Sequence, residues 1–270
     1  MDMIRLDELA ERQFGIDRAT ADALIMEGRI RIGSVPAEKA GTPVPADTVL
    51  TLKEKAKKYA SRSGYKLEKA LEVFRVDPTG LTVCDIGASN GGFTDCPLQH
   101  GAAHVFSVDV AYGILAWELR NDERVTVLER TNARRLTPEQ LGGTICDMVT
   151  VDVSFISLTK IFPAIRQILR DGGEVVTLIK PQFEAKPQQL GKNGILRDPD
   201  ATLPPLLTSI LTAAAENGLI ADGLTVSPIH GTNGNVEYLA HYRHDESTAS
   251  PLAEDWQEII RDVLTLQPDL

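Results

Sequence analysis

The chain has 270 residues, of which 43% are hydrophobic and 24% charged, proportions that are ordinary for a globular protein of one or two domains. A net charge of −10 argues against a protein that coats nucleic acid indiscriminately, and no apolar run reaches the roughly 18 residues of a membrane span. MDMIRLDELAERQ lacks the apolar core of a signal peptide, and Cys84, Cys96 and Cys146 form no C-x-x-C pair. We therefore expect a cytoplasmic protein without a metal site or a disulfide framework.

Residues 1–58 predict a small α+β domain. The segments 4–14 and 18–28 carry apolar residues at helical spacing, and Asp17 is placed to cap the second helix. The stretches RIRIGSV and TVLTL then alternate as short strands do, with turn residues between them. Two helices followed by a small β portion are expected.

The charge is distributed unevenly along the chain. Residues 53–75 contain eight basic and three acidic residues, whereas residues 245–270 contain seven acidic residues and one basic residue. The acidic total therefore conceals a basic stretch directly after the small domain. We expect residues 59–64 to form a basic linker that leads into a second domain, residues 65–270.

From Thr82 onward, apolar β-branched segments alternate with helical ones. This alternation predicts an α/β fold in which helices cover both faces of a mostly parallel sheet. Residues 224–231 and 235–243 predict an antiparallel pair at the end of the domain. The predicted strands are 82–87, 104–110, 125–130, 147–155 and 174–180, and the predicted helices are 92–101, 113–121, 159–169 and 201–218.

A glycine-rich loop, CDIGASNGGFTD, follows the first of these strands and opens a helix. Its glycines let the backbone turn tightly and approach a ligand closely. Ser89 stands where a dinucleotide-binding loop has its second glycine, which disfavours a nicotinamide-dependent oxidoreductase. Asp85, at the strand end before the glycines, instead fits the loop of S-adenosylmethionine-dependent methyltransferases, because the methionine part of that ligand carries an ammonium group.

Two further polar residues end the next two strands. Asp109 can accept hydrogen bonds from both ribose hydroxyls of an adenosine. Asn132 is placed to meet the adenine amino group, although it could equally be an ordinary turn residue. The expected S-adenosylmethionine site comprises Asp85, Gly87, Ser89, Gly91, Gly92, Phe93, Asp109, Asn132 and Asp152.

Four charged residues are expected at the same edge of the sheet. Asp152 and Lys180 lie at or near strand ends, Glu237 opens a later strand after a glycine turn, and Lys66 lies in a helix before the first strand. Each alone has an ordinary explanation, such as a snorkelling lysine or a surface ion pair. In an open α/β sheet, however, ligands gather beyond the carboxyl ends of the strands, so the four together predict a site.

Seven segments occur in the order SRSGYKL, DIGASNGGFTD, DVAYGILAWELR, ERTNAR, DVSFISL, IKPQFE and GNVEYL. On these the chain resembles the TlyA, or hemolysin-like, family over nearly its whole length. The resemblance implies an FtsJ-type ribose 2′-O-methyltransferase domain with a Rossmann-like, seven-stranded class I fold. It also implies transfer of a methyl group from S-adenosylmethionine to a cytidine 2′-hydroxyl in ribosomal RNA. Residues 1–58 resemble the α-L RNA-binding domain through RLD and ALIMEGRIRI, although GSVPAEKAG stands where many members have an Asn-Gly turn.

The resemblance also implies roles for individual residues. Lys66, Asp152, Lys180 and Glu237 match the catalytic tetrad of the family, in which Lys180 would take the hydroxyl proton or stabilise the alkoxide. Tyr65 or Phe155 could stack on a base, although packing in the interior is the expected state of Phe155. The basic residues expected to contact RNA are Arg5, Arg18, Arg29, Lys57, Lys58, Arg62, Lys192 and Arg197.

Two other functions stay open. Membrane lysis is suggested by the hemolysin label of the family, and lysis of red cells by the pure protein would support it. A non-catalytic RNA-binding assembly factor would bind the cofactor without forming an RNA product. The target nucleotide and the ribosomal subunit are left open, and a monomer is expected.

Overall fold

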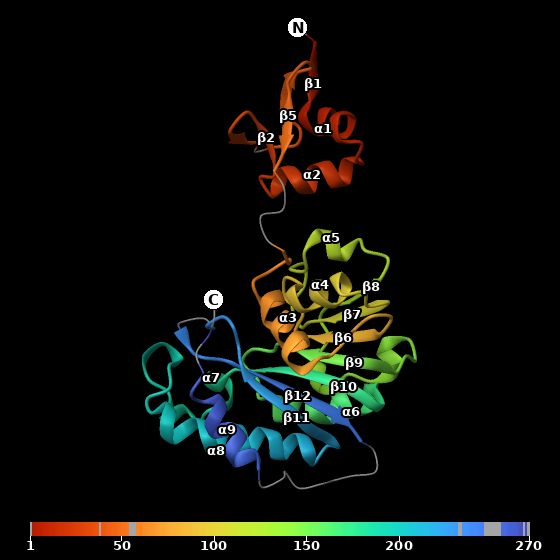
Figure 1. Cartoon of the computed structure of the whole chain (residues 1–270). Coiled ribbons are helices and arrows are strands. Elements are labelled where there is room, and N and C mark those ends of the chain that lie inside the picture. Colours follow the sequence, from red (N-terminus) through yellow and green to blue (C-terminus); the bar gives the residue numbers. More distant parts are fainter. Residues whose placement is uncertain are drawn as a thin grey trace. The chain divides into compact units, whose positions relative to one another are not determined.

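The computed structural model describes residues 2–37, 39–53, 58–231, 234–245, 255–266 and 268. The chain divides into two compact units, residues 1–58 and residues 59–270 (Figure 1). Each unit has its own hydrophobic core, so the two are described separately.

The first unit packs two helices on two small sheets. Its core contains Leu6, Leu9, Leu24 and Ile25 from α1 (Leu6–Phe14) and α2 (Arg18–Met26). The Asp17 carboxylate accepts a hydrogen bond from the Thr20 N–H at 2.8 Å, which confirms the predicted cap. The antiparallel pairs join β1 (Met3–Arg5) to β4 (Pro43–Pro45), and β2 (Ile30–Ile32) to both β3 (Val35–Pro36) and β5 (Leu50–Leu52).

The second unit is built on a seven-stranded sheet of order β11-β12-β10-β9-β6-β7-β8. The five strands from β10 to β8 run parallel, whereas β12 is antiparallel to both β10 and β11. The predicted α/β class and its mostly parallel sheet are confirmed. The strands are β6 (Thr82–Ile86), β7 (His104–Val108), β8 (Val125–Leu128), β9 (Cys146–Val151), β10 (Leu169–Ile179), β11 (Leu219–Val226) and β12 (Tyr238–His244).

Helices cover both faces of this sheet (Figure 1). One face packs against α3 (Ser63–Phe74), α4 (Gly92–Gln99) and α5 (Trp117–Arg120), and the other against α6 (Phe162–Ile168), α8 (Pro199–Ala215) and α9 (Trp256–Val263). A one-turn helix, α7 (Pro181–Glu184), follows β10 directly. Short 3-10 turns lie at Ala133–Arg135, Pro138–Leu141, Leu158–Lys160, Pro187–Gln189 and Lys192–Gly194.

Residues 59–64 are not the linker that the basic composition predicts. Tyr59 is fully buried in the second unit, and its hydroxyl donates to Glu68 at 2.9 Å. The Ala60 N–H donates to the Asp95 carboxylate at 2.7 Å, and α3 already begins at Ser63. The free energy gained by burying the Tyr59 ring therefore exceeds the preference of the polar neighbouring residues for water. As a result, the segment packs as part of the second unit.

Several predicted elements have different bounds in the structure, among them β10, which begins at Leu169 rather than at residue 174. The helix expected over 113–121 is reduced to α5, and Gly113 adopts the left-handed conformation with a φ of 74°. The terminal antiparallel pair is present, but its first strand begins at Leu219 rather than at residue 224. Phe74 occupies the space that a side chain at Gly223 would need. Glycine often marks a turn, but here Gly223 permits close packing within a strand.

Candidate active site

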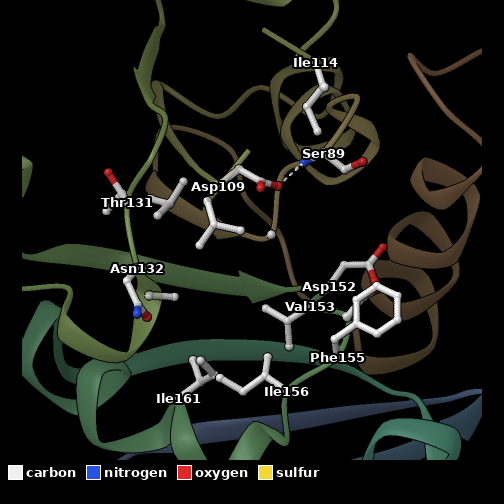
Figure 2. Close-up of a pocket in the computed structure, with 15 residues that line it drawn as sticks. Ser89, Asp109, Ile114, Thr131, Asn132, Asp152, Val153, Phe155, Ile156 and Ile161 are labelled. Carbon is white, nitrogen blue, oxygen red and sulfur yellow. Dashed lines mark hydrogen bonds between the residues drawn. The ribbon is translucent and has the colours of Figure 1, made fainter. Parts of the chain in front are cut away.

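Four neighbouring strand ends of the second unit surround a cavity of about 290 Å³. Of the nine residues predicted to bind the cofactor, Gly87, Ser89, Asp109, Asn132 and Asp152 line it. They follow β6, β7, β8 and β9, whose carboxyl ends meet at this edge because the strands are parallel. Figure 2 shows Ser89, Asp109, Asn132 and Asp152 placed around one space.

Asp109 fixes the shape of this cavity. One of its carboxylate oxygens accepts a hydrogen bond from the Ser89 N–H at 2.8 Å (Figure 2). The other accepts one from the Ala111 N–H, also at 2.8 Å. Ser89 adopts a left-handed backbone conformation, with a φ of 50°. A carboxylate has about four lone-pair sites, so each Asp109 oxygen keeps capacity to accept a ribose hydroxyl. The geometry fits the predicted adenosine contact.

The glycines of the loop allow close approach by different neighbours. Gly87 has a φ of 86°, and a Cβ there would lie 2.5 Å from the backbone oxygen of Asp152, so the loop and the end of β9 touch backbone to backbone. Gly91 and Gly92 do not line the cavity, because Leu119 and Ser63 fill the space that their side chains would need. Phe93 is a buried core residue. These three residues do not line the cavity, and their predicted contacts with the cofactor stay predictions.

Asp85 is placed differently from the prediction. Its carboxylate is fully buried beneath the cavity, where it accepts hydrogen bonds from the Thr94 hydroxyl at 2.6 Å and the Thr150 hydroxyl at 3.2 Å. Burial raises the pKa of Asp85 to about 7, and the nearby carboxylates of Asp152 and Asp109 act in the same direction. Asp85 thus supports the cavity floor rather than lining it.

The raised pKa makes Asp85 a source of pH-dependent instability. The folded state binds the proton more tightly than the unfolded state, whose pKa is near 3.8, so the free energy of unfolding falls as the pH rises from about 4 to about 7. At 1.36 kcal/mol per pKa unit the full loss is about 4 kcal/mol. We expect Asp85→Asn to be more stable than the unaltered chain, by an amount that grows by about 2 kcal/mol between roughly pH 5.5 and pH 8.5.

Urea unfolding followed by tryptophan fluorescence measures this effect, because Trp117 and Trp256 both lie in the second unit. The exposed Asp262 provides a control, and Asp262→Asn should show no such pH dependence. An Asp85→Asn gain that is the same at both pH values would contradict the assignment.

The four predicted catalytic residues form two ion pairs. The Lys180 ammonium lies 2.6 Å from the Asp152 carboxylate and donates to the Ser154 hydroxyl at 3.0 Å. The Lys66 ammonium lies 2.5 Å from the Glu237 carboxylate, and both of these side chains are buried. Because burying an ammonium and a carboxylate together is costly unless they pair closely, these contacts are the expected arrangement.

The sheet register brings the two ion pairs to the same end of β10. Ile179 is the register partner of Tyr238, Lys180 follows the former and Glu237 precedes the latter. Lys66 reaches Glu237 from α3, on one face of the sheet. Asp152 both pairs with Lys180 and lines the cavity that Ser89 and Asp109 also line, so one carboxylate connects the two parts of the site.

Several basic residues predicted to contact RNA are held by acidic neighbours. Arg5 pairs with the buried Asp7 at 2.6 Å, and Arg18 pairs with Glu11 at 3.3 Å. Arg29 lies 3.6 Å from a Glu27 oxygen. Lys58, Arg62, Lys192 and Arg197 are exposed, and Lys57 lies outside the described residues.

Phe155 contradicts the expected packing in the interior. Its side chain is 91% exposed, its backbone has a left-handed φ of 64°, and it lines the same cavity as Asp109 and Asp152. Its ring centroid lies 4.9 Å from that of Phe183, which follows Lys180 closely in the chain. The strand β9 ends at Val151, so the apolar alternation that suggested burial does not extend to this residue.

The sequence interpretation missed the apolar side of the cavity. Val110, Ile114 and Ile156 line it, and Val110 and Ile114 are exposed in this structure. The apolar letters of DVAYGIL were the available signal, but they also fit the helix expected there. In the described residues no group of three or more His, Cys, Asp or Glu side chains could hold a metal ion, and no helix has the length and apolar character to cross a membrane.

Comparison with known proteins identifies close relatives. The FtsJ-like methyltransferase family matches residues 59–244. Over 237 residues the chain is 44% identical to the 16S/23S rRNA (cytidine-2′-O)-methyltransferase TlyA of Mycobacterium tuberculosis, covering 87% of this chain and 88% of that protein. It is 39% identical to Hemolysin A of Brachyspira hyodysenteriae over 241 residues, covering 88% of this chain and 99% of that protein.

A solved structure also matches this chain over both of its units. It comes from a Streptococcus thermophilus protein that carries the hemolysin name, with a TM-score of 0.71 and 39% identity, and the match covers 98% of this chain and 96% of that one. A methyltransferase structure from Listeria monocytogenes matches with a TM-score of 0.50 and 15% identity over 69% of this chain and 100% of that one, which shows the fold alone.

Proposed function

Because this chain belongs to the FtsJ-like methyltransferase family and uses S-adenosylmethionine as its cofactor, we propose that it methylates the 2′-hydroxyl of a cytidine in ribosomal RNA. The relatives named as rRNA (cytidine-2′-O)-methyltransferases support the substrate. The observation that carries the proposal is the position of Asp152, which lines the cofactor cavity and holds Lys180 at 2.6 Å. Such a substrate would be met in the cytoplasm.

The first unit is proposed to be an α-L RNA-binding domain. Its two helices, followed by short strands, support this assignment. Because Arg5, Arg18 and Arg29 have acidic partners, their net contribution to an RNA-binding surface is reduced. The exposed Arg62, in the second unit, is a further basic residue proposed to attract phosphates.

The proposed reaction needs a nucleophile held in line with a methyl group. S-adenosylmethionine supplies that methyl group on a sulfonium centre. Lys180 meets the ribose 2′-hydroxyl, where it accepts the proton as a neutral amine or, as the ammonium, stabilises the negative charge that develops on the oxygen. Asp152 and Ser154 fix the direction of the Lys180 ammonium. Lys66 and Glu237 hold the ribose from the other side of β10.

Phe155 and Phe183 are proposed to hold the target base. Removing water from an exposed aromatic ring costs little free energy, and stacking of the ring on a base contributes about 1–3 kcal/mol to binding. The 91% exposure of Phe155, which lines the cavity, supports this role, as does its contact with Phe183 in α7. A stacked base would direct its ribose toward Lys180.

Labelled methyl transfer to purified 30S and 50S subunits that lack the modification tests the proposal. We expect 2′-O-methylcytidine in the RNA of at least one subunit, located by nuclease mapping and mass spectrometry. Methylation of a base, or cofactor binding without any RNA product, would contradict it. Red-cell lysis by the same cofactor-free preparation would instead support the membrane-active alternative.

Gly231 positions the carboxylate of Glu237. A Cβ at residue 231 would collide with the Glu237 carboxylate group, and a hydrogen bond of 2.9 Å from the Gly231 N–H to the Asn235 carbonyl holds the backbone of residue 231 in place. We expect Gly231→Ala to displace Glu237 and to lower kcat roughly 10-fold to 100-fold, with cofactor affinity unchanged.

A compensating variant separates this effect from simple misfolding. Gly231→Ala combined with Glu237→Asp shortens the acidic side chain by one methylene and should restore part of the lost rate. Steady-state kinetics and calorimetric cofactor binding measure both variants. A Gly231→Ala chain with unaltered kcat would show that the carboxylate position is unimportant.

A further inference from the structure

A second cavity, of about 420 Å³, lies between α8 and the loops that follow β9 and β10. Ser157 and Thr159 contribute from the first loop, Glu184 and Lys186 from the second, and Ser209 from α8. This cavity shares no lining residue with the cofactor cavity. It is called the flanking pocket below.

The flanking pocket is continuous in sequence with the proposed base-stacking pair. Ser157 comes two residues after Phe155, and Glu184 comes directly after Phe183. The two aromatic rings contact each other at 4.9 Å between centroids, and Phe155 also lines the cofactor cavity. A polynucleotide whose target base lies against these rings therefore carries its neighbouring nucleotide past the same two loops.

Glu184 gives the flanking pocket a strong hydrogen-bond acceptor. One carboxylate oxygen accepts the Leu158 N–H at 2.8 Å, and burial raises the pKa of this carboxyl above its usual range. A carboxylate has about four lone-pair sites, so these contacts leave acceptor capacity toward the cavity. The hydroxyls of Thr159 and Ser209 add groups that can donate or accept.

The lining favours one class of ligand. A single carboxylate together with the Lys186 ammonium provides neither a cation cage nor an anion site, and apolar side chains of Pro205, Leu206 and Ile210 accompany the hydroxyls. A planar ring with hydrogen-bonding edges fits this mixture, and Glu is a usual acceptor for the amino group of a base.

We propose that the flanking pocket receives the base of a nucleotide adjacent to the methylated one and selects a base with an exocyclic amino group, which donates to Glu184. The inference rests on the proposed function, because it needs an RNA substrate. It adds a sequence preference that the catalytic residues themselves do not supply, since their contacts are with the ribose.

The test uses short RNA hairpins that contain the mapped target cytidine. At each flanking position the base is replaced by an analogue without its amino group, such as 2-pyrimidinone for cytosine or purine for adenine. We expect one flanking position at which this change lowers kcat/KM of the unaltered enzyme roughly 10-fold to 100-fold, since a hydrogen bond to a charged group is lost.

Three variants assign that preference to the pocket. Glu184→Gln keeps an oxygen for the Leu158 N–H but turns an NH2 group toward the base, and should lose the discrimination. Ser209→Tyr fills the cavity from the exposed side of α8 without altering Glu184, and should lower kcat/KM on the native hairpin. Glu216→Gln, at the exposed end of the same helix, should behave as the unaltered chain.

Different results would contradict the flanking-pocket proposal alone and the proposed function as well. If the unaltered chain methylates the hairpin but no flanking amino group matters, or if Glu184→Gln retains the discrimination, the flanking pocket is wrongly assigned and the proposed function stands. If the unaltered chain methylates neither hairpins nor ribosomal subunits, both proposals are overturned.

Discussion

Lys180→Ala is expected to lower the rate of methyl transfer by about 10²-fold to 10⁴-fold, the range of a group that handles a proton in the transition state. The substitution removes the ammonium that Asp152 and Ser154 orient toward the end of the sheet. Cofactor affinity should change little, because Lys180 does not line the cofactor cavity. Single-turnover transfer to ribosomal RNA and calorimetric binding of S-adenosylmethionine measure the two quantities separately.

Two further variants sharpen this result. Lys160→Ala removes an exposed lysine from a nearby turn and should leave kcat unchanged. Lys180→Arg retains a positive charge that cannot be given up at ordinary pH, so activity in this variant would favour charge stabilisation over proton acceptance. Near-normal transfer by Lys180→Ala would overturn the proposed role of this residue.

Asp109→Ala is expected to raise the Kd for S-adenosylmethionine about 100-fold. Hydrogen bonds to a charged group contribute about 1.5–3 kcal/mol each, and the variant loses those proposed to the ribose. It also releases the Ser89 and Ala111 N–H groups, which Asp109 holds at 2.8 Å. Calorimetry with S-adenosylmethionine and with S-adenosylhomocysteine should show the same loss, because both ligands carry the same ribose.

The control for Asp109 is an exposed aspartate elsewhere in the second unit. Asp262→Ala on α9 should bind the cofactor normally. Asp109→Asn keeps one acceptor oxygen, so we expect an intermediate loss of about 10-fold. An unchanged Kd for Asp109→Ala would mean that the cofactor lies elsewhere.

The sheet and the edge that carries the site could be predicted because they depend on periodicity. Short β-branched strands alternating with helices leave few topologies, and parallel strands place Asp109, Asp152 and Lys180 at one edge. The pairing of Lys66 with Glu237 spans 171 residues, and no local pattern encodes it. The expected edge of the sheet and the family resemblance grouped these two residues with Asp152 and Lys180, but neither predicted their direct ion pair.

The parts that could not be predicted depend on what each residue packs against. A glycine-rich motif requires close approach of the backbone, but it does not say whether a ligand or a side chain approaches. Gly91 and Gly92 face Leu119 and Ser63, for example. Composition likewise counts Arg5 as a free cation, although Asp7 neutralises it. Phe155 is exposed because β9 ends earlier than its apolar pattern suggests.

The ion pair between Lys66 and Glu237 also orders events during synthesis of the chain. It joins the first helix of the second unit to its last strand, and β12 must enter between β10 and β11 before the sheet is continuous. Translation delivers Lys66 long before Glu237. A ribosome-bound chain that ends before residue 237 therefore contains Lys66 and β10 but lacks their partners, Glu237 and β12. The four charged residues of the site, Lys66, Asp152, Lys180 and Glu237, are therefore all present only after residue 237 has been synthesised.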